Sequence, residues 1–202
     1  RPLNAPQLIG TVMNLTPKQT ALACLAAATA RGDQEALATA LNDAFDHAAL
    51  TVEESKSALE QLYAYCGFPR SLNALATLLA TVEARQAAGK STPPGRPAAA
   101  IPAVDMSVIG TEMQTALAGQ PVSGPLFTFS PHIDHYLKAH LFGDIFADDR
   151  LQHQEREVVT IAALAAMDGV TGQLAAHLRI GANTGLNPAQ LEAVQAVAHT
   201  AP

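Results

Sequence analysis

The sequence is poor in aromatic residues, with no Trp, three Tyr and six Phe among 202 residues. Hydrophobic residues nevertheless make up 49% of the chain, and nearly all of them are Ala, Leu, Val and Ile. This mixture suits closely packed helices better than strands, and its amount is ample for a buried core. We therefore expect an all-α protein and do not expect disorder as its main state.

Basic residues and long hydrophobic runs are also scarce. The twelve Lys and Arg are scattered, and the formal net charge is −6, so no basic stripe is present to neutralise a phosphate backbone. The longest apolar run covers residues 21–28, far fewer than the roughly 18 to 20 residues that cross a bilayer. We therefore expect neither nucleic acid nor a membrane as a partner.

The two cysteines, Cys24 and Cys66, form no CxxC pair. Both fall within apolar helical patterns, and we expect both to be buried packing residues. The first residue is Arg1 rather than Met, so a targeting segment would not be visible in this sequence. The cytoplasm is the default location, and export stays an alternative.

Capping signals and apolar spacing organise the first half of the chain. Thr16, Pro17 and Gln19 have the order of a helix start with a capping box. Thr51 to Glu54 forms a second capping box. The segment Tyr-Cys-Gly-Phe-Pro at residues 65–69 is expected to turn the chain. The expected helices cover residues 17–30, 34–47, 51–63 and 70–87.

Residues 89–103 contain four prolines among Gly, Ala, Ser and Thr. Such a segment cannot sustain a helix and lacks the hydrophobic residues to pack. We interpret it as a linker between a first unit, residues 1–88, and a second unit, residues 104–202. In the second unit we expect a loop over residues 119–131 and helices over residues 108–118, 151–167, 173–180 and from 187, with one further helix that carries His135 and His140 and ends near Gly143.

The second unit repeats the order of the first: helix, break, helix, Leu with a cap, helix. Leu15 matches Leu151 and Leu50 matches Leu186, both at an offset of 136 residues. Ala26 and Ala27 match Ala162 and Ala163 at the same offset, and with one extra residue Leu37 and Leu41 match Leu174 and Leu178. Duplication of one helical unit is the simplest explanation.

Two segments of the second unit, residues 154–167 (QEREVVTIAALAAM) and 173–186 (QLAAHLRIGANTGL), resemble the carboxymuconolactone decarboxylase family. Residues 48–54 and 65–69 resemble the second half of the same unit. The resemblance implies an all-α fold whose units associate, commonly as trimers or hexamers. For this chain we expect a trimer of two-repeat chains. The resemblance also implies a small-molecule substrate and, for the decarboxylating branch that acts on a lactone acid, no metal or organic cofactor.

The resemblance implies a second activity, that of the alkylhydroperoxidase D-like branch. That branch reduces peroxides with a CxxC pair, a Glu on the preceding helix and a His four residues after the second Cys. Counted back from His177, the two cysteine positions are occupied by Val170 and Gln173. Peroxide reduction needs a thiolate and a resolving thiol, so we disfavour this activity here.

Glu157 and His177 are the candidate catalytic residues. Glu157 shares a helical stripe with Ile161 and Leu164, so its carboxylate is expected to face the packed side of its helix. If the two helices form an antiparallel hairpin, the carboxylate would orient the imidazole as a general acid or base. Two alternatives stay open: His177 is an ordinary core residue, or Glu157 only favours the helix N-terminus. Glu155 takes the place of Glu157 in the pair if the facing of this helix differs from the one expected.

Four further residues are candidates for substrate binding. Arg156 or Arg179 would hold a substrate carboxylate, although Arg side chains are commonly solvated or ion-paired at the surface. His140 is expected to line the same pocket as His177, whereas the spacing of His132, His135 and His140 gives no zinc site. Asn183 is either a pocket donor or part of an ordinary helix ending.

In the first unit, Ala21 and Ala40 occupy the positions of Glu157 and His177. That copy therefore lacks the acid–base pair, and we expect it to be a structural partner that covers the pocket with Tyr65 and Phe68. The leading hypothesis is a cofactor-free lyase with His177 at its centre. The alternative is a non-catalytic or ligand-binding helical assembly, and a thiol peroxidase ranks third.

Overall fold

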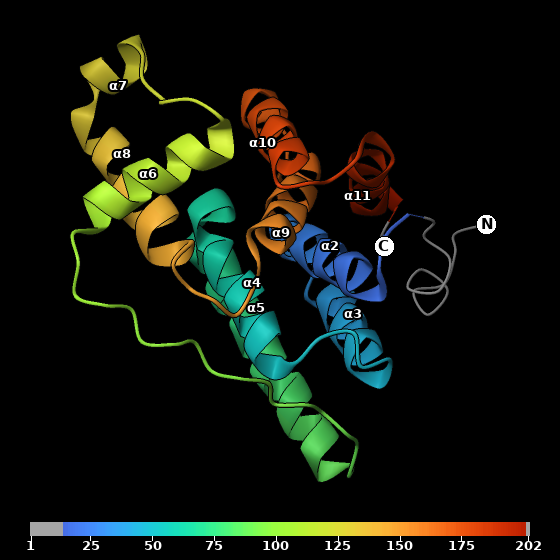
Figure 1. The fold of residues 1–202 in the computed structure, drawn as a ribbon. Helices are drawn as coiled ribbons and strands as arrows, with labels where there is room; N and C mark the ends of the chain where they lie inside the picture. The colour runs from blue at the N-terminus through green and yellow to red at the C-terminus, as the bar shows by residue number, and fades with distance from the viewer. Residues whose placement is uncertain (1–13, 201–202) are drawn as a thin grey trace.

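A computed structural model describes residues 14–200, and the regular structure within this range is helical (Figure 1). The all-α prediction is therefore confirmed. The first repeat contributes α2 (Pro17–Arg31), α3 (Gln34–Asp46), α4 (Val52–Gln61) and α5 (Tyr63–Ala87). The second part of the chain contributes α6 (Met106–Ala118), α7 (Pro125–Phe129), α8 (Pro131–His135), the π-helix η1 (Tyr136–Ile145), α9 (His153–Ala165), α10 (Thr171–Asn183) and α11 (Pro188–Thr200).

The capping signals in the sequence mark real helix starts. At α2, the Thr16 hydroxyl accepts a hydrogen bond from the Gln19 amide, and the Gln19 side chain accepts one from the Thr16 amide. Thr51 and Glu54 form the same reciprocal pair at α4. Each box satisfies two amide groups that a helix leaves unpaired at its start.

The expected turn at residues 65–69 is a sharp bend inside α5. Gly67 has φ 84° and ψ 158°, which is outside the helical region, and Pro69 follows it. Positive φ is strained for any residue with a Cβ, so a glycine is required at this bend. The short segment before Gly67 can therefore turn Tyr65 towards the second repeat while the rest of α5 packs on the first.

The central pair of helices comes from matching positions of the two repeats. α2 packs against α9 (Figure 1), and residues 19–30 of α2 and 156–164 of α9 are buried throughout. Small Ala side chains in both helices allow this close contact. Residues of both repeats join one hydrophobic core, so the repeats are packed as one unit.

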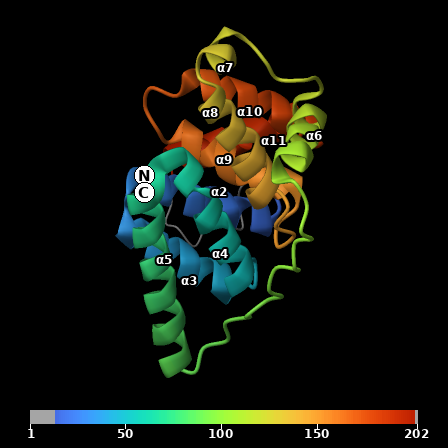
Figure 2. The ribbon, with the colours of Figure 1, turned by 90° about the vertical axis from the view of Figure 1, so that its left-hand side faces the viewer.

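The linker holds no helix, as expected, but it is not without contacts. The carbonyl groups of Pro93 and Pro94 accept hydrogen bonds from the amides of Val52 and Glu53 at the start of α4. The buried Arg85 side chain donates to Thr92 Oγ1 at 2.9 Å and to the Ser91 carbonyl oxygen at 2.8 Å. The segment lacks hydrophobic side chains that pack, as expected, but polar groups attach it to α4 and α5 instead. Figure 2 shows it running from the end of α5 past α4 to α6.

The helix expected to carry His135 and His140 is divided into α8 and η1. The helix α6 crosses η1 at Gly110, so closely that a Cβ at this position would overlap the Lys138 carbonyl oxygen. On η1, a Cβ at Gly143 would lie 2.8 Å from the Met106 carbonyl oxygen of α6. Two glycines thus allow two helix backbones to meet. The expected loop over residues 119–131 also contains the short helix α7.

Candidate active site

Glu157 of α9 and His177 of α10 form a buried hydrogen-bonded pair. His177 Nδ1 lies 2.8 Å from Glu157 Oε2, with side-chain exposures of 11% and 0%. An ionised carboxylate only accepts hydrogen bonds, so Nδ1–H donates to Glu157 Oε2, and the remaining ring nitrogen, Nε2, is not engaged by the carboxylate. The structure therefore brings together the two residues that the sequence placed on facing helices.

Two local features place the pair. The chain reverses between α9 and α10 at Gly169, which has φ 77°. One turn after His177, Gly181 packs against α9 so tightly that a Cβ would lie 2.9 Å from Ile161 Cδ1. Glycine at this position lets α10 approach α9 closely enough for the imidazole to reach the carboxylate.

Tyr65 reaches the pair from the first repeat. Its ring meets the His177 ring edge-on, with centroids 5.5 Å apart and planes at 84°. Burial raises the pKa of Tyr65, and the negative charge of Glu157 raises it further, so the hydroxyl stays protonated. Within residues 14–200, neither the Tyr65 hydroxyl nor Glu157 Oε1 makes a hydrogen bond of good geometry, and both atoms are buried. The Thr160 side chain lies close enough to the Tyr65 oxygen to lower its pKa against the effects of burial and of Glu157.

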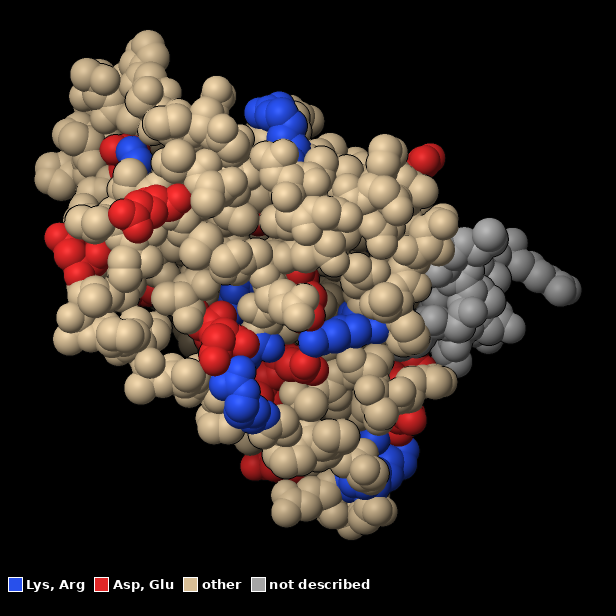
Figure 3. Space-filling model, in the orientation of Figure 1, with Lys and Arg blue, Asp and Glu red and all other residues tan. Residues whose placement is uncertain are grey.

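The neighbouring acidic residue, Glu155, faces elsewhere. Lys18 at the start of α2 lies 3.0 Å from Glu155 Oε2 and 2.7 Å from Glu54 Oε1. Glu155 thus belongs to an ion-paired group between α2, α4 and α9. Acidic and basic side chains lie side by side near the middle of the face shown in Figure 3. Of the two carboxylates left open by the sequence, Glu157 is the one that faces His177.

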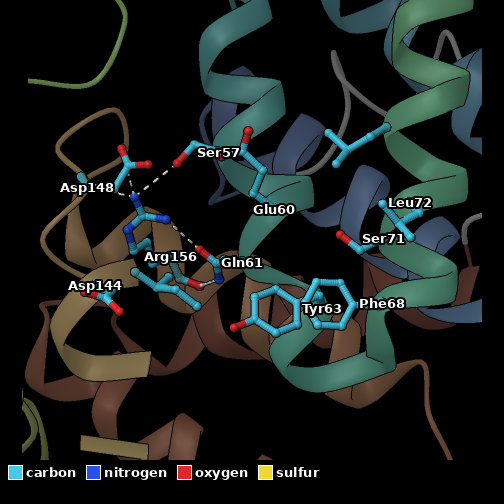
Figure 4. A pocket seen from close by; sticks show the side chains of 12 residues that line it. Ser57, Glu60, Gln61, Tyr63, Phe68, Ser71, Leu72, Asp144, Asp148 and Arg156 are labelled. Atoms are coloured by element: carbon cyan, nitrogen blue, oxygen red, sulfur yellow. Dashed lines mark hydrogen bonds and ion pairs between the residues drawn. The ribbon is translucent and has the colours of Figure 1, made fainter. Parts of the chain in front are cut away.

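Arg156 is buried, not solvated. With 1% exposure, its guanidinium donates to Gln61 Oε1 at 2.9 Å, to Ser57 Oγ at 3.0 Å and to the Asp148 carbonyl oxygen at 2.7 Å (Figure 4). Consecutive helical residues point about 100° apart, which directs Arg156 away from the side of Glu157. The surface alternative for Arg156 is therefore wrong, and its side chain joins α9 to α4 of the first repeat.

Arg156 borders a cavity of about 300 Å³ at the junction of the repeats. The stacked rings of Tyr63 and Phe68, 4.2 Å apart, form one wall (Figure 4). Glu157 and His177 are not among its lining residues. The full lining is Ser57, Glu60, Gln61, Tyr63, Phe68, Ser71, Leu72, Leu75, Asp144, Ile145, Asp148 and Arg156.

His140 lies beside this junction cavity and not beside His177, contrary to expectation. Its ring is 5.6 Å from that of Tyr63, and its Nδ1 lies 2.8 Å from Asp144 Oδ2. Both contacted residues line the junction cavity. His140 and Asp144 lie four residues apart on the π-helix η1 and pair with each other.

Arg179 and Asn183 of α10 do not join the pair either. Arg179 is exposed, and within the described range its side chain makes no hydrogen bond or ion pair. Asn183 Nδ2 donates to the Leu117 carbonyl oxygen at 2.9 Å. The amide that we expected as a pocket donor instead attaches α10 to the end of α6.

The aromatic residues expected to cover one pocket separate between two places. Tyr65 contacts His177, whereas Phe68 lines the junction cavity. In the first repeat, Ala21 lies on α2 with 1% exposure and Ala40 lies on α3. Neither side chain can take part in proton transfer.

The thiols do not suggest an alternative site. Cys24 is buried, and burial raises its pKa to about 12. Cys66 is only half-buried, contrary to expectation; burial raises its pKa, and Sγ donates to the Leu62 carbonyl oxygen. Thiols with raised pKa values are protonated near pH 7 and are poor nucleophiles. Across residues 14–200, no cluster of three or more His, Cys, Asp or Glu is arranged to hold a metal ion.

Comparison with known families supports the resemblance seen in the sequence. The family model for the carboxymuconolactone decarboxylase family matches residues 8–80 and 131–201, one segment in each repeat. The chain belongs to this family. Two family segments in one chain confirm the tandem duplication. No curated protein matches the sequence significantly. Within residues 14–200, none of the helices of this family member has the length and apolar character to cross a membrane.

Proposed function

We propose that this member of the carboxymuconolactone decarboxylase family is a lyase that acts on a small carboxylate or lactone by acid–base catalysis. The observation that supports the proposal most is the 2.8 Å contact between Glu157 and His177. A carboxylate that holds one imidazole nitrogen leaves the other free for proton transfer at near-neutral pH.

His177 Nε2 would be the working atom. In a decarboxylation, the bond between the substrate carbon and its carboxylate breaks, carbon dioxide leaves, and the electron pair remains as an enolate. The protonated His177 then gives its Nε2 proton to that carbon, and a proton from water restores the imidazolium. This sequence needs no electron acceptor, in keeping with the cofactor-free chemistry that the family resemblance implies.

Burial of the pair supports its proposed role. Opposite charges interact more strongly when water is excluded, so Glu157 would stabilise the imidazolium that donates the proton. Burial also fixes the geometry, because neither side chain can rotate freely between α9 and α10. Arg156 is already bonded to Gln61, Ser57 and Asp148, so we no longer assign it to the substrate carboxylate.

A ligand-binding assembly without catalysis is the second candidate, and the junction cavity is the observation that favours it. The cavity is about 300 Å³ in volume, which falls at the lower end of the range for small-molecule sites. It is lined by both repeats and does not depend on the acid–base pair. This alternative predicts that a ligand stabilises the protein without being converted.

We also propose that the chain forms a homo-oligomer, with the trimer as the expected form. Phe68, Leu72 and Leu79 of α5 are each 60% exposed. Exposed apolar side chains that gather on one element are typical of protein–protein contact surfaces. Sedimentation of the purified chain would measure its oligomeric state.

The test is turnover of a panel of lactone acids and small carboxylates, followed by release of carbon dioxide and by product NMR. We expect His177→Gln to lower the turnover number by about 10²- to 10⁴-fold, the contribution typical of a general acid or base. Glutamine keeps a polar side chain of similar length, and circular dichroism would check that the fold is retained.

Retention of full turnover in His177→Gln would rule out the lyase mechanism. Ligand-induced stabilisation with no product from any member of the panel would favour the binding assembly.

A further inference from the structure

Two buried polar atoms of opposite kind lie unpaired beside the Glu157–His177 pair. Glu157 Oε1 is a buried acceptor without a donor, within the part of the chain that is described. The Thr160 hydroxyl, which already accepts from Gln61, lies beside the Tyr65 oxygen and lowers its pKa, but among the described residues no acceptor lies in good geometry for the Tyr65 O–H proton. A buried polar group without a partner is costly, and most such groups in proteins are paired. Two complementary groups at one site therefore indicate a functional arrangement.

The two groups come from different repeats. Tyr65 lies before the bend at Gly67 in the first repeat, and its ring packs edge-on against His177 of the second repeat at 5.5 Å. The charge of Glu157 also acts on the Tyr65 hydroxyl, because it raises the pKa of that group in addition to the effect of burial. Tyr65 thus contacts one member of the pair and is influenced electrostatically by the other.

We propose that Tyr65 is a positioning residue whose hydroxyl donates to Glu157 Oε1 in the folded protein in solution, before any substrate binds. Its hydrogen bond would hold the carboxylate so that Oε2 remains on His177 Nδ1. The first repeat, which lacks an acid–base pair of its own, would then supply Tyr65 as the third member of the site in the second repeat. This inference rests on the proposed function for its catalytic meaning, but the hydrogen bond can be tested without any substrate.

The proposed bond has a definite effect on the pair. A carboxylate that accepts a hydrogen bond at Oε1 has less negative charge to share at Oε2, so it accepts more weakly from His177. Loss of the Tyr65 hydroxyl would therefore strengthen the bond between Glu157 and His177. A side chain with only a packing role would leave that bond unchanged when its hydroxyl is removed.

Tyr63 provides a matched control on the same helix. It lies two residues before Tyr65, but its ring stacks on Phe68 at 4.2 Å at the wall of the junction cavity (Figure 4). Tyr63→Phe therefore removes the same hydroxyl group from a neighbouring position that does not contact the pair.

The experiment is NMR of the full chain with ¹⁵N-labelled histidine, with the His177 signals assigned through His177→Gln. We expect Tyr65→Phe to move the His177 Nδ1 proton resonance downfield, the direction of a stronger hydrogen bond, while Tyr63→Phe leaves it in place. If the lyase activity is found, Tyr65→Phe should also lower the turnover number by about 3- to 10-fold, with little change in KM.

An unchanged His177 resonance in Tyr65→Phe would overturn the inference, even if activity fell, because Tyr65 would then act by another route. Equal shifts in both tyrosine variants would overturn it as well, since they would reflect repacking of α5. Absence of turnover in the wild-type protein would count against the lyase proposal alone, because the resonance is measured without substrate.

Discussion

Arg156 shows how much a single buried side chain contributes to the union of the two repeats. Its guanidinium joins Gln61 and Ser57 of α4 to the Asp148 carbonyl of the second repeat. Burial lowers the pKa of Arg156, although nearby Asp148 acts in the opposite direction. These partners stabilise the charged form of the guanidinium, and the guanidinium in turn satisfies the hydrogen-bonding needs of these buried acceptors.

We expect Arg156→Met to lower the free energy of unfolding by about 2–4 kcal/mol, because Gln61, Ser57 and the Asp148 carbonyl would lose a buried partner. Arg179→Met is the matched control: Arg179 is exposed, and its replacement should change the stability by less than about 0.5 kcal/mol. Urea unfolding of both variants would measure the difference. Equal effects would show that the Arg156 contacts add little.

At the residue scale, the sequence predicted the acid–base pair better than its surroundings. Helical spacing and the family resemblance both pointed to Glu157 and His177, because each lies on an apolar stripe of a recognisable helix. The sequence does not show which way a side chain points, so we assigned three further residues to the same pocket: Arg156, His140 and Asn183. Their actual partners, such as Leu117 for Asn183, are distant in sequence, and no local pattern reveals them.

At the scale of elements, the helix starts could be predicted because their signals are local. The capping boxes at Thr16 and Thr51 depend on residues three positions apart. The π-helix η1 was not predicted, because it accompanies a close crossing with α6 that involves Gly110 and Gly143. The linker contacts were missed for a similar reason: they pair backbone groups of residues 93 and 94 with the start of α4.

We expect Gly110→Ala to destabilise the protein by about 1–3 kcal/mol or more, because the added methyl group would overlap the Lys138 carbonyl and force α6 away from η1. Gly172→Ala is the control, since no atom lies within 4 Å of a Cβ at that helical position. It should be neutral or stabilise α10 by up to about 1 kcal/mol. Thermal unfolding would compare the two, and tolerance of Gly110→Ala would show that the crossing is loose.

At the scale of the whole molecule, an ion-pair network also joins the repeats. Arg150, before α9, donates to Asp148 and to Glu53 of α4. Burial alone would raise the pKa of Asp148, but hydrogen bonds from Arg150 hold that pKa below its usual value. Hydrogen bonds from Lys56 and then Arg150 lower the pKa of Glu53. The duplication was predictable from sequence, whereas these contacts depend on how the copies pack.

The lowered pKa values determine the sign of the pH dependence. A carboxylate whose pKa is lower in the folded state stabilises the fold above its unfolded pKa of about 4, and this stabilisation is lost as the pH falls through the folded value. We expect the free energy of unfolding to fall below about pH 4, and Arg150→Met to reduce that fall by about 1–2 kcal/mol. Urea unfolding between pH 3 and pH 7 would measure both. If the free energy of unfolding of the wild-type protein and of Arg150→Met fell equally with pH, Arg150 would not be the group that lowers the pKa values of Asp148 and Glu53.

The account depends most on Glu157 and His177 acting as one catalytic unit in the second repeat. A double-mutant cycle of turnover numbers, with Glu157→Gln, His177→Gln and the double variant, tests this claim most directly. If the carboxylate acts through the imidazole, Glu157→Gln should cost about 10-fold or more, and the double variant should be no slower than His177→Gln alone. A double variant whose loss of turnover equals the product of the two single losses would contradict the account, and so would full activity in His177→Gln.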